Sequence, residues 1–135
     1  MRNPFTDPTI AETYESWYTT SLGQAVAQAE KAALLGLAEL RSGETALDVG
    51  CGTGHFTQML AEAGAQAAGC DASEAMLHQA ARTRQELRWQ LADARELPYA
   101  DATWDLVLSV TMLEFVEEPA RALDEMWRVL APGGR

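Results

Sequence analysis

Basic residues are scarce in this chain of 135 residues, which carries a formal net charge of −10. Lysine occurs once, at position 31, and the one local group of cations is Arg82, Arg84 and Arg88. Affinity for a phosphate backbone comes from clustered cations, so this composition argues against RNA or DNA as a partner. The three arginines lie around the end of a predicted helix, where cations complement the helix dipole, and we expect them to be solvated.

Cysteine is also scarce, and the pattern needed for a metal site is missing. Cys51 and Cys70 belong to no Cys-x-x-Cys or Cys/His cluster, and we expect both to be free thiols. If their strands are neighbours, the two could cross-link under oxidation, although packing as small apolar side chains is the favoured interpretation. His55 and His78, the only histidines, lie on predicted helices without partners and are given no acid–base or metal role.

Long apolar runs are absent as well. No stretch approaches the length of a membrane span, and the polar start of the chain lacks the apolar core of a secretory signal. We therefore expect a cytoplasmic protein with no membrane association. The composition is 47% hydrophobic and 22% charged and shifts nowhere along the chain, which predicts a single globular domain over residues 1–135.

What the chain does contain is a repeated strand–helix pattern. Apolar residues at helical spacing predict a helix over residues 22–40, so that residues 1–40 form a helical cap on a core of residues 41–135. Within this core the predicted strands are 45–49, 66–70, 87–91 and 104–110, and the predicted helices are 56–63, 74–83 and 119–130.

The apolar patterns of these elements differ in an informative way. Alternation over residues 87–91 suits an edge strand, whereas the continuous apolar run of residues 104–110 suits a strand that is covered on both sides. In the last helix we expect one apolar stripe to face the core, formed by Ala120, Leu123, Met126, Trp127 and Leu130.

This pattern predicts the α/β class, with a Rossmann-like, doubly wound parallel sheet in the strand order 3-2-1-4. Ligands of such sheets bind beyond the carboxyl ends of the strands. Four polar residues fall at those ends, about one strand–helix unit apart: Asp48, Asp71, Asp93 and Ser109. The fold would therefore bring them into one crevice.

Glycines at alternate positions, Gly50, Gly52 and Gly54, follow the first predicted strand. Glycine lets the backbone bend sharply and approach a ligand closely, and the helix that follows directs its free N–H groups at the same crevice. Asp71, at the tip of the second strand, can accept two hydrogen bonds from vicinal ribose hydroxyls. These features predict a nucleotide-binding crevice.

Residues near the second and third strands could complete a base pocket. The Asp93 carboxylate could accept from an adenine amine while the Ala94 N–H donates to a ring nitrogen, the alternative being an ordinary loop aspartate. Cys70, Ala72 and Met76 could supply apolar walls, although core packing explains them almost as well.

Two kinds of ligand compete for this crevice. The dinucleotide fingerprint G-x-G-x-x-G fits imperfectly, because His55 stands at its last position. Residues 47–54 (LDVGCGTG) instead closely resemble the first motif of the class I S-adenosylmethionine-dependent methyltransferases. Within that family, the sequence resembles the type 11 enzymes, which act on small molecules. The sequence also resembles the later motifs of that family, in the same order, over residues 69–77, 93–99, 101–116 and 128–134.

The resemblance implies a role for each matched residue. Asp48 and the glycine turn would hold the methionine part of S-adenosylmethionine, Asp71 the ribose, Asp93 and Ala94 the adenine, and the backbone near Ser109 the sulfonium side. An N-terminal aromatic segment would cover the cofactor, with packing on the core as an equal alternative. The predicted cofactor site comprises Asp48, Gly50, Cys51, Gly52, Gly54, Asp71, Ala72, Met76, Asp93, Ala94, Ser109, Tyr14 and Tyr18, with no metal and no assigned catalytic residue.

The implied activity is methyl transfer to a small-molecule acceptor by in-line displacement. For this reaction a protein supplies proximity, orientation and a dry site, so a dedicated base is not required. Glu114 could reach an acceptor or cap a helix. Two alternatives stay open: an NAD-dependent oxidoreductase, and a noncatalytic module that binds S-adenosylmethionine.

One departure from the family concerns the end of the chain. Family members usually continue beyond a turn like that of residues 132–134 into three more strands of a seven-stranded sheet, whereas this sequence ends at Arg135. The resemblance therefore predicts a sheet without its last strands, in which residues 106–108 carry unpaired backbone groups. We expect a C-terminally truncated chain, or a fourth strand covered by a second copy or a partner chain.

Overall fold

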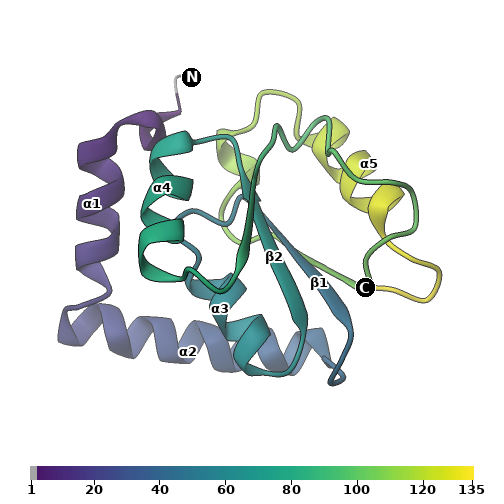
Figure 1. The fold of residues 1–135 in the computed structure, drawn as a ribbon, viewed down its shortest axis with the longest axis horizontal. Helices are drawn as coiled ribbons and strands as arrows, with labels where there is room; N and C mark the ends of the chain where they lie inside the picture. Colours follow the sequence, from purple (N-terminus) through teal and green to yellow (C-terminus); the bar gives the residue numbers. More distant parts are fainter. Residues whose placement is uncertain (1–2) are drawn as a thin grey trace.

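The computed structural model describes residues 3–135, which form a four-stranded parallel sheet flanked by helices (Figure 1). The strands are β1 (Thr45–Val49), β2 (Gln66–Asp71), β3 (Arg88–Leu91) and β4 (Leu106–Leu108). Their order is β3-β2-β1-β4, which confirms the predicted order 3-2-1-4 and the Rossmann-like fold class. Every pair is parallel, so the carboxyl ends of the strands meet at one edge of the sheet.

The helices are η1 (Pro4–Thr6), α1 (Pro8–Trp17), α2 (Ser21–Ala38), α3 (His55–Glu62), α4 (Glu74–Thr83), η2 (Leu113–Phe115) and α5 (Pro119–Val129). The four predicted helices are present, with shifted ends in every case but α4, and three further helices, η1, α1 and η2, were not individually predicted. α2 ends two residues before the predicted boundary, because Glu39 takes a left-handed conformation with φ 46°. Ser73 is the N-cap of α4, as predicted, and its hydroxyl accepts from the N–H of Met76 at 3.2 Å.

Two hydrophobic cores lie on opposite faces of the sheet, because successive strand residues point to opposite faces. Leu47 and Val49 of β1 pack in one core with the buried side chains of α5. Ala46 packs in the other core with α3, Ala38 of α2 and Leu106 of β4. β1 is thus covered on both faces, and it lies between β2 and β4 in the sheet.

The predicted apolar stripe of α5 was wrong. Leu123 and Trp127 are 52% and 78% exposed, and the buried side chains are Ala122, Met126 and Val129. The observed spacing of i, i+4 and i+7 is that of one helix face, and only Met126 is common to both sets. The five predicted residues span a wider arc of α5 than the part of the helix that contacts the sheet. The face that is buried lies next to the predicted one.

The two outer strands show different edges. β3 is an edge strand, as its alternation predicted, and its side chains are largely exposed. β4 is shorter than predicted, and its outer edge is not bare: the N–H of Val107 donates to the carbonyl of Arg135 at 2.9 Å, and the N–H of Arg135 donates to the carbonyl of Asp105 at 3.0 Å. The prediction of unpaired backbone groups at this strand is therefore wrong for Val107, because its N–H pairs with Arg135.

None of the helices formed by residues 3–135 combines the length and the hydropathy that crossing a bilayer requires.

Candidate functional site

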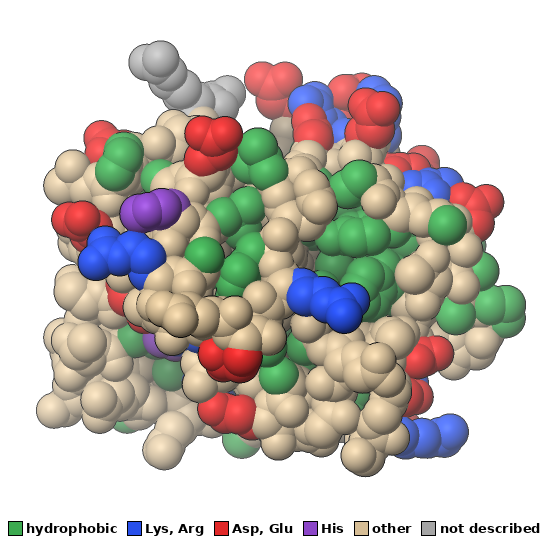
Figure 2. Space-filling model, viewed as in Figure 1, with side chains coloured by type: hydrophobic (Ala, Val, Ile, Leu, Met, Phe, Trp, Pro, Cys, Tyr) green, Lys and Arg blue, Asp and Glu red, His purple; other side chains and the backbone are tan. Residues whose placement is uncertain are grey.

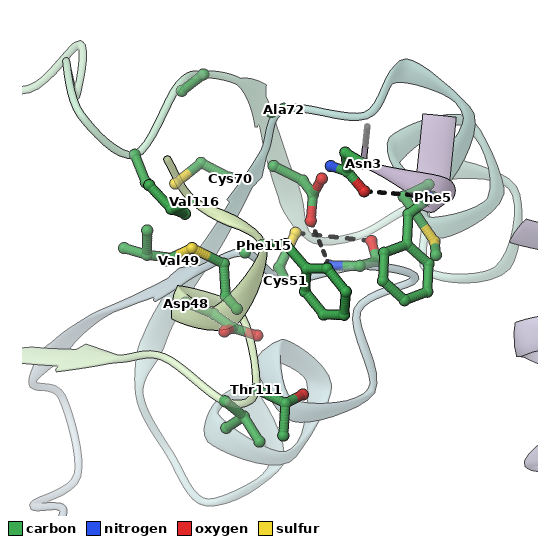
Figure 3. A pocket seen from close by; sticks show the side chains of 18 of the residues that line it. Asn3, Phe5, Asp48, Val49, Cys51, Cys70, Ala72, Thr111, Phe115 and Val116 are labelled. Carbon is green, nitrogen blue, oxygen red and sulfur yellow. Dashed lines mark hydrogen bonds between the residues drawn. The ribbon is translucent and has the colours of Figure 1, made fainter. Parts of the chain in front are cut away.

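A cavity of about 540 Å³ lies where the strands end, and segments from most of the chain contribute to it. Its size is typical of small-molecule sites, which span about 300–1,000 Å³. Ten of the thirteen predicted residues line it: Asp48, Gly50, Cys51, Gly52, Asp71, Ala72, Met76, Asp93, Ala94 and Tyr14. Figure 3 shows Asp48, Cys51, Phe5 and Phe115 among the side chains that surround this space.

Asp71 joins the ends of β1 and β2. One carboxylate oxygen accepts from the N–H of Gly52 at 2.9 Å, and the other accepts from the N–H of Ser73 at 2.9 Å. Burial raises the pKa of Asp71, although these backbone donors oppose the rise. An ionised carboxylate has about four lone-pair sites, so two hydroxyl donors can still be accepted.

Asp48 is buried at the floor of the site, with 1% of its surface exposed. Its carboxylate accepts a hydrogen bond of 2.8 Å from the hydroxyl of Thr57, which lies on α3 and was not predicted. Burial raises the pKa of Asp48 to about 7, the hydrogen bond from Thr57 opposes this, and the nearby charge of Asp71 adds to it. A cationic group in the cavity would favour the ionised form of this carboxyl.

Asp93 faces the cavity and is paired with Arg95, a partner that was not predicted. Arg95 donates to both carboxylate oxygens of Asp93, at 2.7 Å and 3.0 Å, and lowers the pKa of this carboxyl. The same guanidinium lies 3.3 Å from the carboxylate of Glu118. Arg95 therefore links the loop after β3 to the start of α5, and among the described residues that line the cavity it is the one Lys or Arg.

An aromatic wall closes one side of the cavity. The ring of Phe5 packs edge-on against Tyr14, with centroids 5.9 Å apart, and against Phe115, with centroids 5.2 Å apart. Tyr14 was predicted here, but Phe5 and Phe115 were missed, because they lie 110 residues apart in the sequence and no local pattern joins them.

Three predicted residues do not line the cavity. Gly54 has φ 92° and lies against Trp89, whose Cη2 would be 2.3 Å from a Cβ added at this position. Tyr18 stacks on His55 with ring centroids 3.6 Å apart. The hydroxyl of Ser109 is buried and has no hydrogen-bond partner among residues 3–135, and the residues that follow it, 110–112, line the cavity instead.

Behind the glycine turn, the structure corrects two further expectations. His55 has partners: its Nε2 is 3.0 Å from Glu15 Oε2, and its Nδ1 is 3.1 Å from Arg84 Nη2. Arg84 is 6% exposed rather than solvated, because its guanidinium is enclosed by hydrogen-bond acceptors from four segments.

The two cysteines are free and buried, as the packing interpretation predicted. A Cβ added at Gly69 would be 2.8 Å from Cys51 Sγ, so that thiol lies on the face of β2 opposite to the side chain of Cys70 (Figure 3). This placement disfavours a cross-link. Within residues 3–135, no group of three or more His, Cys, Asp or Glu side chains could hold a metal ion.

Comparison with known proteins matches residues 47–135 to a family described as methyltransferase domain. A malonyl-[acyl-carrier protein] O-methyltransferase of Serratia marcescens is 35% identical over 101 residues, covering 75% of this chain and 40% of that protein. A demethylmenaquinone methyltransferase of Paenarthrobacter aurescens is 38% identical over 97 residues, covering 72% of this chain and 38% of that protein. The chain thus spans less than half the length of either relative.

A solved structure from Methanococcus maripaludis, assigned to the S-adenosyl-L-methionine-dependent methyltransferases, is similar with a TM-score of 0.84 and 22% identity. The match covers 99% of this chain and 63% of that chain, and at this identity it shows a shared fold.

Proposed function

We propose that this chain, which belongs to the class I S-adenosylmethionine-dependent methyltransferase family, binds S-adenosylmethionine in the cavity at the strand ends and serves methyl transfer to a small molecule. The family membership is the premise, because the family match covers residues 47–135. The observation that carries the proposal is the convergence of the glycine turn and the carboxylates of Asp48, Asp71 and Asp93 on one cavity.

The residues present fit the cofactor chemically. S-adenosylmethionine carries an ammonium and a sulfonium. Among residues 3–135 the cavity lining holds one cation, Arg95, and five acids, which are Asp48, Asp71, Asp93, Glu114 and Glu117. Asp48 would hold the ammonium, since a positive charge beside its buried carboxyl offsets the cost of ionising it. Asp71 would hold the ribose hydroxyls, and Ala72 with Met76 would pack against the base.

Asp93 and Ala94 would meet the adenine edge. Because Arg95 already donates to both oxygens of Asp93, the exocyclic amine would share that carboxylate with the guanidinium. When bound, the cofactor would supply an electrophilic methyl group. The chain's own part is to orient the two reactants and to exclude water, which the aromatic wall around Phe5 does on one side.

The acceptor proposed is a small molecule. The two curated relatives are named for malonyl-[acyl-carrier protein] and for demethylmenaquinone, which are chemically different acceptors. On the face shown in Figure 2, Lys and Arg side chains are scattered among acidic ones, and this arrangement does not favour a nucleic acid. A cytoplasmic location, and a second copy or partner chain beside β4, belong to the same proposal.

Calorimetric titration of the purified chain with S-adenosylhomocysteine tests the proposal. We expect saturable binding, and binding about 10- to 100-fold weaker in Asp71→Ala, since charge-assisted hydrogen bonds contribute about 1.5–3 kcal/mol. Asp71→Asn is the milder variant if Asp71→Ala does not fold. Asp124→Ala, at an exposed position of α5, is the control and should bind as the native chain does.

A parallel titration with NADH distinguishes a site for S-adenosylmethionine from a site for a nicotinamide dinucleotide. Binding of NADH without S-adenosylhomocysteine would support an NAD-dependent oxidoreductase and would contradict the proposal. Binding of S-adenosylhomocysteine without turnover of S-adenosylmethionine, with any acceptor, would support a noncatalytic module instead.

A further inference from the structure

A buried cation lies directly behind the glycine turn, outside the cavity. Arg84 is the C-cap of α4, and 7% of its side chain is exposed. It does not line the cavity, and the roles proposed above make no use of it. Enclosing a guanidinium is costly unless its donors are matched by acceptors, so the partners of this side chain indicate what it is for.

The first partner is the glycine turn itself. Arg84 Nη1 donates to the carbonyl of Thr53 at 3.0 Å, and Nε donates to the side chain of Gln58 at 2.6 Å. Thr53 precedes Gly54, the N-cap of α3, and Gln58 lies one turn into that helix. Arg84 therefore holds the end of the turn and the start of α3 from the side opposite to the cavity.

The second partner is α1, which lies beside α4 in Figure 1. Arg84 Nη1 is 3.5 Å from the carboxylate of Glu15, and the other oxygen of Glu15 is 3.0 Å from His55 Nε2. Burial opposes ionisation of Glu15, but the hydrogen bond to His55 and the nearby positive charges outweigh burial and lower its pKa to about 2. Tyr14, the residue before Glu15, lines the cavity.

The third partner is β3. The carbonyl of Arg84 accepts from the indole N–H of Trp89 at 3.2 Å. The ring of Trp89 lies against Gly54 and Gly69, close enough that a Cβ at either position would be within 2.7 Å of it. The backbone of Arg84 thus also fixes the ring on which the glycine turn rests.

We propose that Arg84 is a positioning residue of the cofactor site, which fixes the glycine turn through the carbonyl of Thr53 and joins that turn to α1 through Glu15. This rests on the proposed function insofar as the ligand is S-adenosylmethionine. The coupling is reciprocal. Docking of α1 on Arg84 stabilises the conformation of the turn that binds the cofactor, and cofactor binding in turn stabilises the docking of α1.

Hydrogen exchange of the ligand-free chain tests the link itself. We expect Arg84→Lys, which loses the fork of donors, to raise amide exchange in residues 50–55 and also in residues 8–17 of α1. Glu15→Gln, on α1, should raise exchange in the turn although it does not touch Thr53. Arg82→Lys, at an exposed position of the same helix, should change neither segment.

Titration with S-adenosylhomocysteine tests the effect on the site. At a temperature where every variant is folded, we expect Arg84→Lys and Glu15→Gln each to weaken binding about 5- to 20-fold, and the double variant to be little weaker than Arg84→Lys alone. If Arg84→Lys unfolds at a lower temperature but binds with native affinity, the role of Arg84 is purely structural and the proposal is overturned. Changes in amide exchange that are confined to the mutated segment would also overturn it.

The two proposals fail in different ways. A native chain that does not bind S-adenosylhomocysteine would contradict the proposed function, whereas the exchange experiment needs no ligand and would still decide whether Arg84 couples α1 to the turn.

Discussion

Replacing Asp48 with Asn should stabilise the fold at neutral and alkaline pH while weakening the cofactor site. Asp48 is 1% exposed, and burial raises its pKa from 3.8 to about 7. Between those two values the folded chain holds a proton that the unfolded chain has lost. The free energy of unfolding therefore falls as pH rises from about 4 to about 7, and it stays lowered above that range.

The size of the effect follows from the shift. One pKa unit corresponds to about 1.36 kcal/mol, so a rise from 3.8 to about 7 costs on the order of 4 kcal/mol above pH 7. Asn is isosteric and uncharged, and its side-chain oxygen can still accept from the Thr57 hydroxyl. Asp48→Asn should thus gain a few kcal/mol at pH 8.5, a smaller amount at pH 5.5, and almost nothing near pH 4.

Urea denaturation of the native chain and of Asp48→Asn at pH 4.5, 5.5, 7 and 8.5 measures this difference. Asp124→Asn, at an exposed position on α5, is the control and should show no such pH dependence. A stability difference that is constant between pH 5.5 and 8.5 would refute the reasoning, because it would show that folding does not raise the pKa of Asp48 into this range. Titration with S-adenosylhomocysteine at pH 8 should show weaker binding by Asp48→Asn.

Three further predictions concern packing and reactivity. Gly54→Ala should cost more stability than Gly43→Ala, because both have positive φ but only the first would place a Cβ against Trp89; equal losses in urea denaturation would contradict this. Met126→Ala should cost about 2–5 kcal/mol, whereas Trp127→Ala, 78% exposed, should stay within about 0.5 kcal/mol. Both thiols are buried with raised pKa values, so Ellman's reagent at pH 8 should react with them only as the chain unfolds; fast reaction of the native chain would show that they are accessible.

Local sequence was enough for the parts of the site that stand next to one another along the chain. The alternation of Gly50, Gly52 and Gly54 after an apolar strand predicts a turn, since glycine adopts the positive φ that all three have here. Asp71 could be placed at the tip of the next strand, because crossovers between parallel strands are right-handed and bring consecutive strand ends together. The expected strand order β3-β2-β1-β4, which the structure has, is that of a Rossmann-like sheet and does not follow from handedness alone.

The sequence could not choose between equivalent faces of one helix. α5 carries apolar side chains around much of its circumference, and only its seat on the sheet decides that Val129 is buried and that Trp127 is exposed. It could not show that the outer edge of β4 pairs with Arg135 either, because that contact depends on where the chain returns after α5.

The surroundings of the glycine turn were decided by tertiary structure alone. Arg84, expected at the surface, is buried because α1 brings the carboxylate of Glu15 to it from 69 residues away. Phe5 and Phe115 form one wall although they stand at nearly opposite ends of the sequence. The sequence motif by itself determined where a ligand can approach the backbone, because that depends on local φ angles and on where the strands end. The tertiary structure decided which residues hold and cover the motif, because those contacts join segments that are distant in the sequence.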